Sequence, residues 1–274
     1  MINFNRRTIT LAAIALGLAG MGFAANANTL KEIQSRKKLL VAIDLSVPPY
    51  GMTDAAVQPI GSDVDVARAM AKDMGVEMQI VEVTGPNRVP FLMTSKVDIV
   101  ISSFSVTPDR AKVVAFSTPY SVNQMVLGAS KGTAITKLED LVGKRIGVVR
   151  GNLDDLELTK SAPTGATLVR YGDDATCNTA FSTGQVDAIV KPAATIQALA
   201  KSMPGKNLEV KFTVKVQPLA IGMRKNDTEL ANWINTWVEK NTTNGQLNQI
   251  YTKWMGLPLP DMNKVAIEAR AIAQ

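Results

Sequence analysis

The sequence predicts an α/β protein, because segments typical of buried strands alternate along it with segments of helical periodicity. Residues 39–43 form a continuous apolar run typical of a buried strand, and residues 63–74 place apolar side chains on one face of a helix. A strand-like segment at 145–149 starts the same alternation again later in the chain. Strands and helices that alternate in this way favour largely parallel sheets.

The remaining expected elements follow from the same patterns. An Asn-Asp pair predicts the start of a helix over 228–240, in which Trp233 and Trp237 are spaced as core residues. Asn244-Gly245 predicts the end of this helix, and the Ala-rich tail 262–274 predicts a surface helix. Between these regions we expect strands at 77–83, 99–101 and 167–169, and helices at 89–94 and 153–160.

A short internal echo suggests two similar lobes. Residues 95–100 (SKVDIV) resemble residues 184–190 (GQVDAIV), and each segment combines a helix end, a tight turn and a buried strand. Asp98 and Asp187 occupy matching places in these segments. We expect both carboxylates to fix the local backbone by accepting hydrogen bonds from nearby N–H groups, and to have no part in binding.

The first residues predict export. Arg6 and Arg7 precede an uncharged, apolar stretch at 9–25, and Ala25-Asn26-Ala27 has the small-x-small pattern of a cleavage site. This combination is typical of a secretory signal peptide over residues 1–27. No Cys follows the cleavage site, so we expect no lipid anchor, and a soluble protein retained in the periplasm.

Composition excludes several functions. Without residues 1–27 the chain has 28 Lys and Arg against 24 Asp and Glu, and no basic run exceeds three residues, which is unlike a nucleic-acid binder. The chain has no His, which removes His-based catalytic triads and His zinc sites. Cys177 is the single Cys, so no intramolecular disulfide can form. We therefore expect no metal, no cofactor and no nucleic-acid partner.

A set of short motifs, in one fixed order, carries a family resemblance. The chain resembles the polar amino-acid-binding proteins of bacterial ABC importers, the extracellular solute-binding proteins of family 3. Within it, Asn87-Arg88-Val89-Pro90 is similar to the glutamate- and aspartate-binding branch. The motifs are VAID (41–44) with PPY (48–50), GSDVDVA (61–67), KVDI (96–99), SFSVTPDR (103–110), FSTPY (116–120), LEDLVGKRIG (138–147), and NGQL (244–247) with IYTKW (250–254).

The resemblance implies a periplasmic-binding-protein-like fold, in which two α/β lobes are joined by two crossing strands. Lobe one is then built from 28–123 plus 218–274, and lobe two from 124–217. The crossings are expected near Asn123–Leu127 and Lys215–Ala220. The resemblance also implies a monomer that closes on a small carboxylate ligand, delivers it to the membrane permease of an ABC importer, and is not an enzyme. Ligands of open α/β sheets bind at the carboxyl ends of strands.

Ser103, Ser105 and Arg110 are the expected carboxylate anchor. They follow the strand at 99–101, and Arg110 comes just after Pro108 at a predicted helix start. A guanidinium presents two parallel donors that match a carboxylate. From the residues alone, a capped helix with a solvated Arg is the more common interpretation. The resemblance favours binding instead, because the family holds the ligand's α-carboxylate at these positions.

Two further segments are expected at the site. The resemblance places Arg88 against a ligand's side-chain carboxylate, although a surface Arg at a helix start also fits the pattern. Gly151 and Asn152 lie between a predicted strand and a predicted helix, where free backbone N–H groups attract an anion.

Three positions depart from the family pattern. Leu153 replaces a common Thr, Val47 replaces an aromatic residue, and Pro192 replaces the Asp that usually faces the ligand's α-ammonium. We expect Asp44 to bind an ammonium or a ligand side chain instead, with Tyr50 nearby. Lys191, together with Arg88, would also suit a dicarboxylate that lacks an ammonium group. An acidic amino acid is the first expectation.

One alternative is an enzyme on the same scaffold. A cyclohexadienyl dehydratase-like protein needs a general acid in the cleft, with a pKa raised by burial. Asp154, Asp155 and Glu157 are the candidates, although acids near a helix start usually serve the helix dipole.

Overall fold

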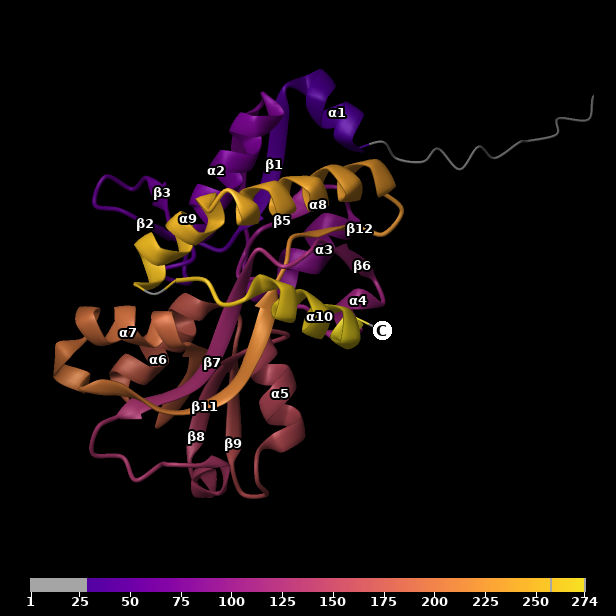
Figure 1. Cartoon of the computed structure of the whole chain (residues 1–274). Helices are drawn as coiled ribbons and strands as arrows, with labels where there is room; N and C mark the ends of the chain where they lie inside the picture. Colours follow the sequence, from indigo (N-terminus) through magenta and orange to yellow (C-terminus); the bar gives the residue numbers. More distant parts are fainter. Residues whose placement is uncertain (1–28, 257, 274) are drawn as a thin grey trace, which may run out of the picture.

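The computed structural model describes residues 29–256 and 258–273, which form two α/β lobes stacked along the long axis of the molecule (Figure 1). The predicted signal peptide lies outside the described residues. Within the described part of the chain, no helix has both the length and the apolar character needed to cross a membrane. The expected α/β class is confirmed, since each lobe combines one five-stranded sheet with helices.

The lobe-one sheet has the strand order β4-β1-β5-β12-β6, with β1 parallel to β4 and β5. Strand β12 comes from the C-terminal part of the chain and pairs antiparallel with β5 and β6. The strands of this lobe are β1 (Lys38–Ile43), β4 (Glu77–Glu82), β5 (Ile99–Val100), β6 (Val114–Phe116) and β12 (Gly222–Arg224), with a small hairpin of β2 (Met52–Thr53) and β3 (Pro59–Ile60).

Helices surround this sheet, and those with predicted bounds begin and end close to their expected positions. Trp237 on α8 is 3% exposed in the lobe-one core, as its spacing predicted, and Trp233 packs against the same core. The helices of this lobe are α1 (Thr29–Arg36), α2 (Ser62–Met74), η1 (Gly85–Asn87), α3 (Arg88–Met93), α4 (Pro108–Ala111), α8 (Thr228–Thr243), α9 (Gln246–Met255) and α10 (Met262–Ala273).

The lobe-two sheet has the order β11-β7-β10-β8-β9, in which β8 runs parallel to β9 and β10. Its strands are β7 (Ser121–Ser130), β8 (Arg145–Val149), β9 (Thr167–Tyr171), β10 (Ala188–Pro192) and β11 (Leu208–Leu219). Its helices are η2 (Leu138–Leu141), α5 (Leu153–Ser161), α6 (Asp174–Thr183), α7 (Ala193–Ser202) and η3 (Pro204–Lys206).

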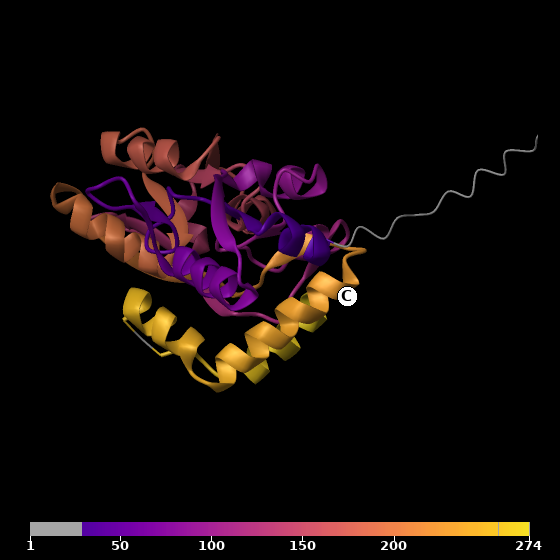
Figure 2. The ribbon, with the colours of Figure 1, turned by 90° about the horizontal axis from the view of Figure 1, so that it is seen from above.

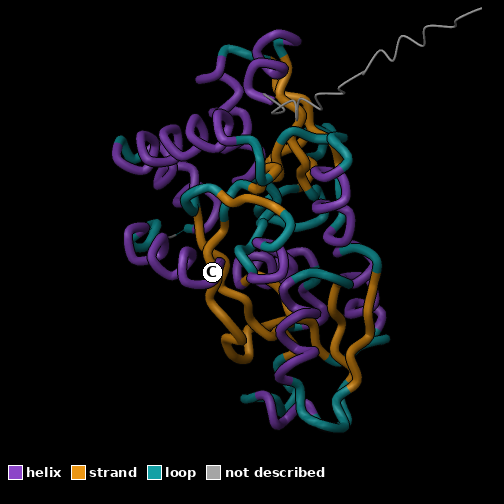
Figure 3. Tube along the Cα trace, turned by 90° about the vertical axis from the view of Figure 1, so that its right-hand side faces the viewer, coloured by secondary structure: helices purple, strands orange, loops and turns teal. Residues whose placement is uncertain are grey.

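Two long strands connect the lobes. Strands β7 and β11 pair antiparallel from Ser121↔Leu219 at one end to Ser130↔Leu208 at the other. At the lobe-one end, Leu219 also bridges to Ser105, and its carbonyl accepts a hydrogen bond from the N–H of Tyr120. Figure 3 shows these strands continuing from one lobe into the other. Both crossing segments inferred from the resemblance overlap the ends of this pair.

The two matching Asp residues fix neighbouring strands. The Asp98 carboxylate accepts a hydrogen bond from the N–H of Leu40 at 2.7 Å and pairs with Arg36. The Asp187 carboxylate accepts one from the N–H of Arg145 at 2.8 Å and pairs with the Arg145 side chain. Each lobe therefore uses its Asp to hold the start of the adjacent parallel strand. The role is structural, as predicted, but the N–H groups belong to a neighbouring strand and not to the local turn.

The C-terminal helix α10 is more than a surface helix. Val265, Ala266 and Ala269 are buried, and Ala269 packs against Val106 and Ala220, next to the point where β11 enters lobe one. Seen from above, α8, α9 and α10 lie together along one side of the molecule (Figure 2). The expectation of a purely peripheral tail was wrong, because small apolar residues on one face of α10 cover this end of the crossing strand.

Candidate ligand-binding site

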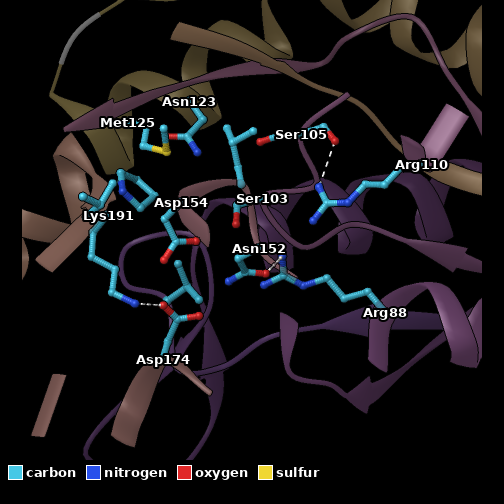
Figure 4. Close-up of a pocket in the computed structure, with 14 residues that line it drawn as sticks. Arg88, Ser103, Ser105, Arg110, Asn123, Met125, Asn152, Asp154, Asp174 and Lys191 are labelled. Carbon is cyan, nitrogen blue, oxygen red and sulfur yellow. Dashed lines mark hydrogen bonds and ion pairs between the residues drawn. The ribbon is translucent and has the colours of Figure 1, made fainter. Parts of the chain in front are cut away.

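A cavity of about 40 Å³ lies between the lobes, at the carboxyl ends of several strands (Figure 4). Lobe one and lobe two both line it, and strand β7 contributes from the connection between them. The lining residues are Val47, Arg88, Ser103, Ser105 and Arg110 from lobe one, Asn123 and Met125 from β7, and Asn152, Leu153, Asp154, Asp174, Val190, Lys191 and Pro192 from lobe two.

Most of the residues predicted from the sequence are brought together here. Gly151 does not line the cavity with its own atoms, but its carbonyl contacts Arg110. Asp44 and Tyr50 lie outside the lining. The predicted residues that line it are Arg88, Ser103, Ser105, Arg110, Asn152 and Lys191.

Arg110 is positioned by a capped turn. Its backbone N–H donates to the Thr107 hydroxyl at the start of α4, and its side chain lies over the Phe104 ring, with Cζ 4.6 Å from the ring centroid. The guanidinium donates to the carbonyls of Ser105 at 3.0 Å and Gly151 at 3.3 Å. Among the described residues, no carboxylate lies within ion-pair distance of it, although Arg110 is only 8% exposed.

Burial lowers the pKa of Arg110 to about 9, with repulsion from Arg88 as a second cause. The guanidinium therefore still carries its charge at neutral pH. A buried cation without a counter-ion is costly, and the cost falls when an anion arrives with matching geometry. Arg110 therefore offers the cavity an unused site for an anion.

Arg88 has a different environment, because its charge is already matched. Its Nη2 donates to Asp44 Oδ2 at 3.0 Å, and the two side chains are 3% and 2% exposed. Asp44 also accepts hydrogen bonds from the N–H and hydroxyl of Ser46. The prediction that Asp44 binds a ligand ammonium does not agree with this placement, because its carboxylate pairs with Arg88 behind the cavity wall.

Ser103 is held in an unusual conformation by a residue that the sequence marked only as part of a motif. Its φ of 40° lies in the left-handed region, which non-glycine residues seldom adopt. The Ser103 N–H donates to Asp63 Oδ2 at 2.5 Å, and Tyr120 donates to the other Asp63 oxygen at 2.7 Å. Burial raises the pKa of Asp63 to about 6. Asp63, in the first turn of α2, thus positions the turn that presents Ser103 to the cavity.

The lobe-two wall carries a second buried ion pair and a further acid. Lys191, at the end of β10, pairs with Asp174 in the first turn of α6, and their side chains are 2% and 4% exposed. Asp154, in the first turn of α5, accepts a hydrogen bond from the N–H of Val149 at 2.8 Å. Burial is the main cause that raises the pKa of Asp154 to about 6, and Asp174 contributes in the same direction.

Three buried polar atoms of lining residues have no hydrogen-bond partner among the described residues. They are Nε of Arg88, Oδ1 of Asn123 and Oδ2 of Asp174. Buried polar atoms are nearly always paired in native proteins, so each such atom points to a further partner. Two of the three are acceptors, Asn123 Oδ1 on the connecting strand β7 and Asp174 Oδ2 on lobe two.

Asp174 and Asn123 were missed by sequence reasoning. A Gly-Asp-Asp run before a helical stretch is a signal for a helix start, and Asp173 indeed caps α6. That signal does not reveal that Asp174 faces a cavity, because the facing element, β10, is distant in sequence. The three departures from the family pattern, Val47, Leu153 and Pro192, all line the cavity.

Direct contacts between the lobes show a closed arrangement. Besides the Arg110 contact with Gly151, the Arg88 guanidinium donates to Asn152 Oδ1 at 3.4 Å. The backbone of Gly85 passes so close to this amide that a Cβ there would lie 2.1 Å from Asn152 Oδ1. A cavity of about 40 Å³ holds only a few waters, so the lobes have to separate to admit an organic ligand.

The fold and the site together define a two-lobe ligand-binding protein, and comparison with known proteins identifies the family. The model of the bacterial extracellular solute-binding proteins, family 3, matches residues 39–257. The chain belongs to this family.

Curated relatives are similar over most of their length. The chain is 29% identical over 236 residues to the ABC transporter glutamine-binding protein GlnH of Bacillus subtilis, covering 83% of this chain and 85% of the relative. It is 27% identical over 262 residues to the L-arginine-binding protein of Pseudomonas aeruginosa, covering 90% and 99%. It is 25% identical over 250 residues to the L-cystine-binding protein TcyJ of Escherichia coli, covering 90% and 93%.

Solved structures agree with this assignment. A mutant of ArgBP from T. maritima superposes with a TM-score of 0.77 at 32% identity, covering 83% of this chain and 99% of that one. The ancestral amino acid-binding protein AncCDT-1, a precursor of cyclohexadienyl dehydratase, also gives a TM-score of 0.77, at 31% identity, covering 82% and 99%.

Proposed function

We propose that this protein is the periplasmic substrate-binding component of an ABC importer and that it binds an amino acid between its two lobes. The observation that carries the proposal is the buried, charged and unpaired Arg110 in the cavity. It supports capture of a carboxylate by Arg110, with Ser103 and Ser105 lining the same wall. Relatives named for binding glutamine, arginine and cystine support an amino acid as the ligand class.

Closure of the lobes is the proposed signal to the membrane permease. A ligand that contacts both walls favours the closed state by the difference between its affinities for the two states. Arg110 and Asn152 belong to opposite lobes and are both within reach of the cavity. The predicted signal peptide supports delivery to the periplasm.

An acidic ligand receives no support from the site or the relatives. Arg88, the residue expected to meet a side-chain carboxylate, is already paired with Asp44. Lys191, which was expected to suit a dicarboxylate, is paired with Asp174. We therefore propose that Arg110 binds the carboxylate of the ligand, and we do not propose an acidic side chain on that ligand.

The experiment that tests the proposal is a thermal-shift screen of the mature chain against L-amino acids, dicarboxylates and aromatic acids. A ligand present at 100 times its Kd stabilises the folded state by about 2.7 kcal/mol. Small-angle scattering with the best binder should show compaction relative to the ligand-free protein. If no compound in the screen stabilises the protein, or the best binder causes no compaction, the proposal fails.

A second candidate is a dehydratase related to cyclohexadienyl dehydratase. The observation in its favour is Asp154, a cavity-lining acid whose pKa is raised by burial to about 6, as a general acid requires. The similarity to AncCDT-1, described as a precursor of such an enzyme, supports the same candidate. Turnover of prephenate or arogenate by the purified chain would replace the transport proposal; bound but unconverted compounds would exclude this alternative.

A further inference from the structure

The ionisable residues of the cavity can be sorted by whether their charge is matched. Arg88 is paired with Asp44, and Lys191 is paired with Asp174, each in a buried contact. Two lining groups remain outside these pairs, the cation Arg110 on lobe one and the acid Asp154 on lobe two. The site therefore presents one surplus charge of each sign, on opposite walls.

The two surplus charges lie apart across the cavity. Figure 4 shows Arg88 and Arg110 on one side, Asp154 and the Lys191–Asp174 pair on the other, and Ser103 with Asn152 between them. A ligand that satisfies both walls needs an anionic group and a cationic group. A zwitterion has this property and brings no net charge into the buried site.

Acceptor atoms for a cationic group are already present on the lobe-two side. Asp174 is 3% exposed, and its Oδ2 has no hydrogen-bond partner among the described residues. In Figure 4 this oxygen points away from Lys191, toward the side on which Asn152 lies. Asn123, on the connecting strand β7, is 5% exposed and its Oδ1 is also unpaired, but Figure 4 shows it beside Met125 rather than beside Asp174. An ammonium has three donors, which match the free oxygen of Asp174 and the carboxylate of Asp154.

Building on the proposed function, we infer that the ligand is an α-amino acid of zero net charge, and that its ammonium is bound on lobe two by Asp154 and the free oxygen of Asp174. Strand β10 cannot supply this contact, because it ends in Lys191 and Pro192. The acids come instead from the first turns of α5 and α6, which follow the neighbouring strands β8 and β9. Burial raises the pKa of Asp154 although the nearby Lys191 acts to lower it, and Asp154 makes no ion pair of its own among the described residues.

The net charge of the ligand follows from the same count. A second carboxylate on the ligand meets only Arg88 and Lys191, whose charges are already matched, so it finds the unpaired Nε donor of Arg88 but no unmatched positive charge. A second cationic group meets no unpaired acid of the described lining besides Asp154 and Asp174, which the ammonium uses. Burying an unmatched charge costs several kcal/mol, so both kinds of ligand bind less well than an uncharged side chain.

The test starts with the unmodified mature chain. All twenty standard L-amino acids are ranked by thermal shift, and the best binder is titrated calorimetrically beside its analogue that lacks the amino group. We expect an amino acid with an uncharged side chain to rank first. A charge-assisted contact is worth about 1.5–3 kcal/mol, so the analogue should bind roughly 10- to 150-fold more weakly.

Variants then locate the ammonium. Asp154→Asn should bring the amino acid close to the affinity of its analogue, while the analogue binds this variant as it binds the unmodified chain. Asp173→Asn is the matched control, because it removes an equal charge next to Asp174, outside the cavity lining, and Asn also caps helices well. The affinity of Asp173→Asn for the amino acid should equal that of the unmodified chain.

The outcomes separate this inference from the proposed function. If a charged amino acid ranks first, or the amino acid and its analogue bind equally, the ammonium site is wrong while carboxylate binding by Arg110 stands. If Asp154→Asn folds and binds the amino acid normally, the ammonium site is also wrong. If none of the amino acids binds, the proposed function fails, and this inference fails with it.

Discussion

Lobe one and lobe two each place a buried ion pair beside the cavity, but they differ in the sign of the charge on the lining residue that remains outside the pair. On lobe one, Asp44 matches Arg88 and leaves Arg110 as a free cation. On lobe two, Lys191 matches Asp174 and leaves Asp154 as a free acid. Two lobes of similar topology thus present opposite surplus charges. Affinity for a dipolar ligand therefore arises from the unmatched residues, while the ion pairs stabilise the structure of the cavity walls.

Breaking the pairs should give the largest effects and test whether they are structural. Lys191→Met leaves Asp174 buried without a cation, and Arg88→Met does the same to Asp44. Loss of one partner of a buried ion pair costs about 3–5 kcal/mol. Urea unfolding of both variants should show losses of this size in the free energy of unfolding. A loss well below 1 kcal/mol for either variant would show that its pair contributes little to the wall.

Removing the free cation should affect binding and leave the fold stable. Arg110→Ala is expected to weaken ligand binding by about 2–5 kcal/mol, because the carboxylate loses its main partner. The free energy of unfolding of the ligand-free chain should fall little or even rise, since an unmatched buried charge is removed. Calorimetric titration and urea unfolding measure the two quantities. Arg68→Ala, an exposed arginine paired with Asp65, is the control and should bind normally. Normal binding by Arg110→Ala would contradict the role given to this residue.

Acidic pH should distinguish the contributions of the two walls to binding, because it protonates Asp154 and leaves Arg110 charged. With a pKa of about 6, Asp154 loses its charge as the pH falls from 7 to 5, and the charged groups that interact with it are Lys191, Asp174 and, across the cavity, Arg110. Affinity for an amino acid should therefore drop by up to about tenfold per pH unit below 6. Affinity for the analogue without an amino group should change far less. Equal pH profiles for both compounds would contradict the ammonium site.

The free energy of unfolding of the ligand-free chain should rise as the pH falls, whereas the affinity for an amino acid should fall. The pKa values of Asp63 and Asp154 are both raised from 3.8 to about 6, so the folded state binds protons more tightly than the unfolded state. Their favourable contribution is fully present below about pH 4 and is lost as pH rises through 6. Asp63→Asn and Asp154→Asn should each flatten this part of the profile in chemical denaturation. No change in either profile would show that these carboxyls do not titrate in this range.

A small change at the contact between the lobes should show how tightly the two walls must approach each other. Gly85→Ala places a Cβ against the Asn152 amide, which has to move for the lobes to close. We expect a weakening of binding by a few-fold, about 0.5–1 kcal/mol, and a more open ligand-free form in small-angle scattering. Gly132→Ala, which meets no atom within 4 Å, is the control. Restored compaction of the ligand-free form in the Gly85→Ala, Asn152→Ala double variant would confirm that the clash is the cause, because this readout does not depend on ligand contacts of Asn152.

Local patterns were sufficient for most of the secondary structure. The apolar run at 39–43 became β1, and the stripe at 63–74 became α2, since strands and helices depend mainly on the period of neighbouring residues. The tail 262–274 was misjudged, because the burial of Ala269 depends on β11 and α4, which are distant in sequence. Pattern alone identifies a helix but not what covers it.

Periodicity was enough to predict the α/β class, whereas the expected carboxylate anchor at Arg110 and the absence of the usual acid at Pro192 came from the family resemblance. Which charges remain free could be read only from the folded chain. Asp44 and Arg88 are 44 residues apart, and Lys191 and Asp174 are 17 apart. Whether an ionisable side chain binds a ligand or a neighbour depends on such distant contacts, because a buried charge is stable only beside a partner of opposite sign.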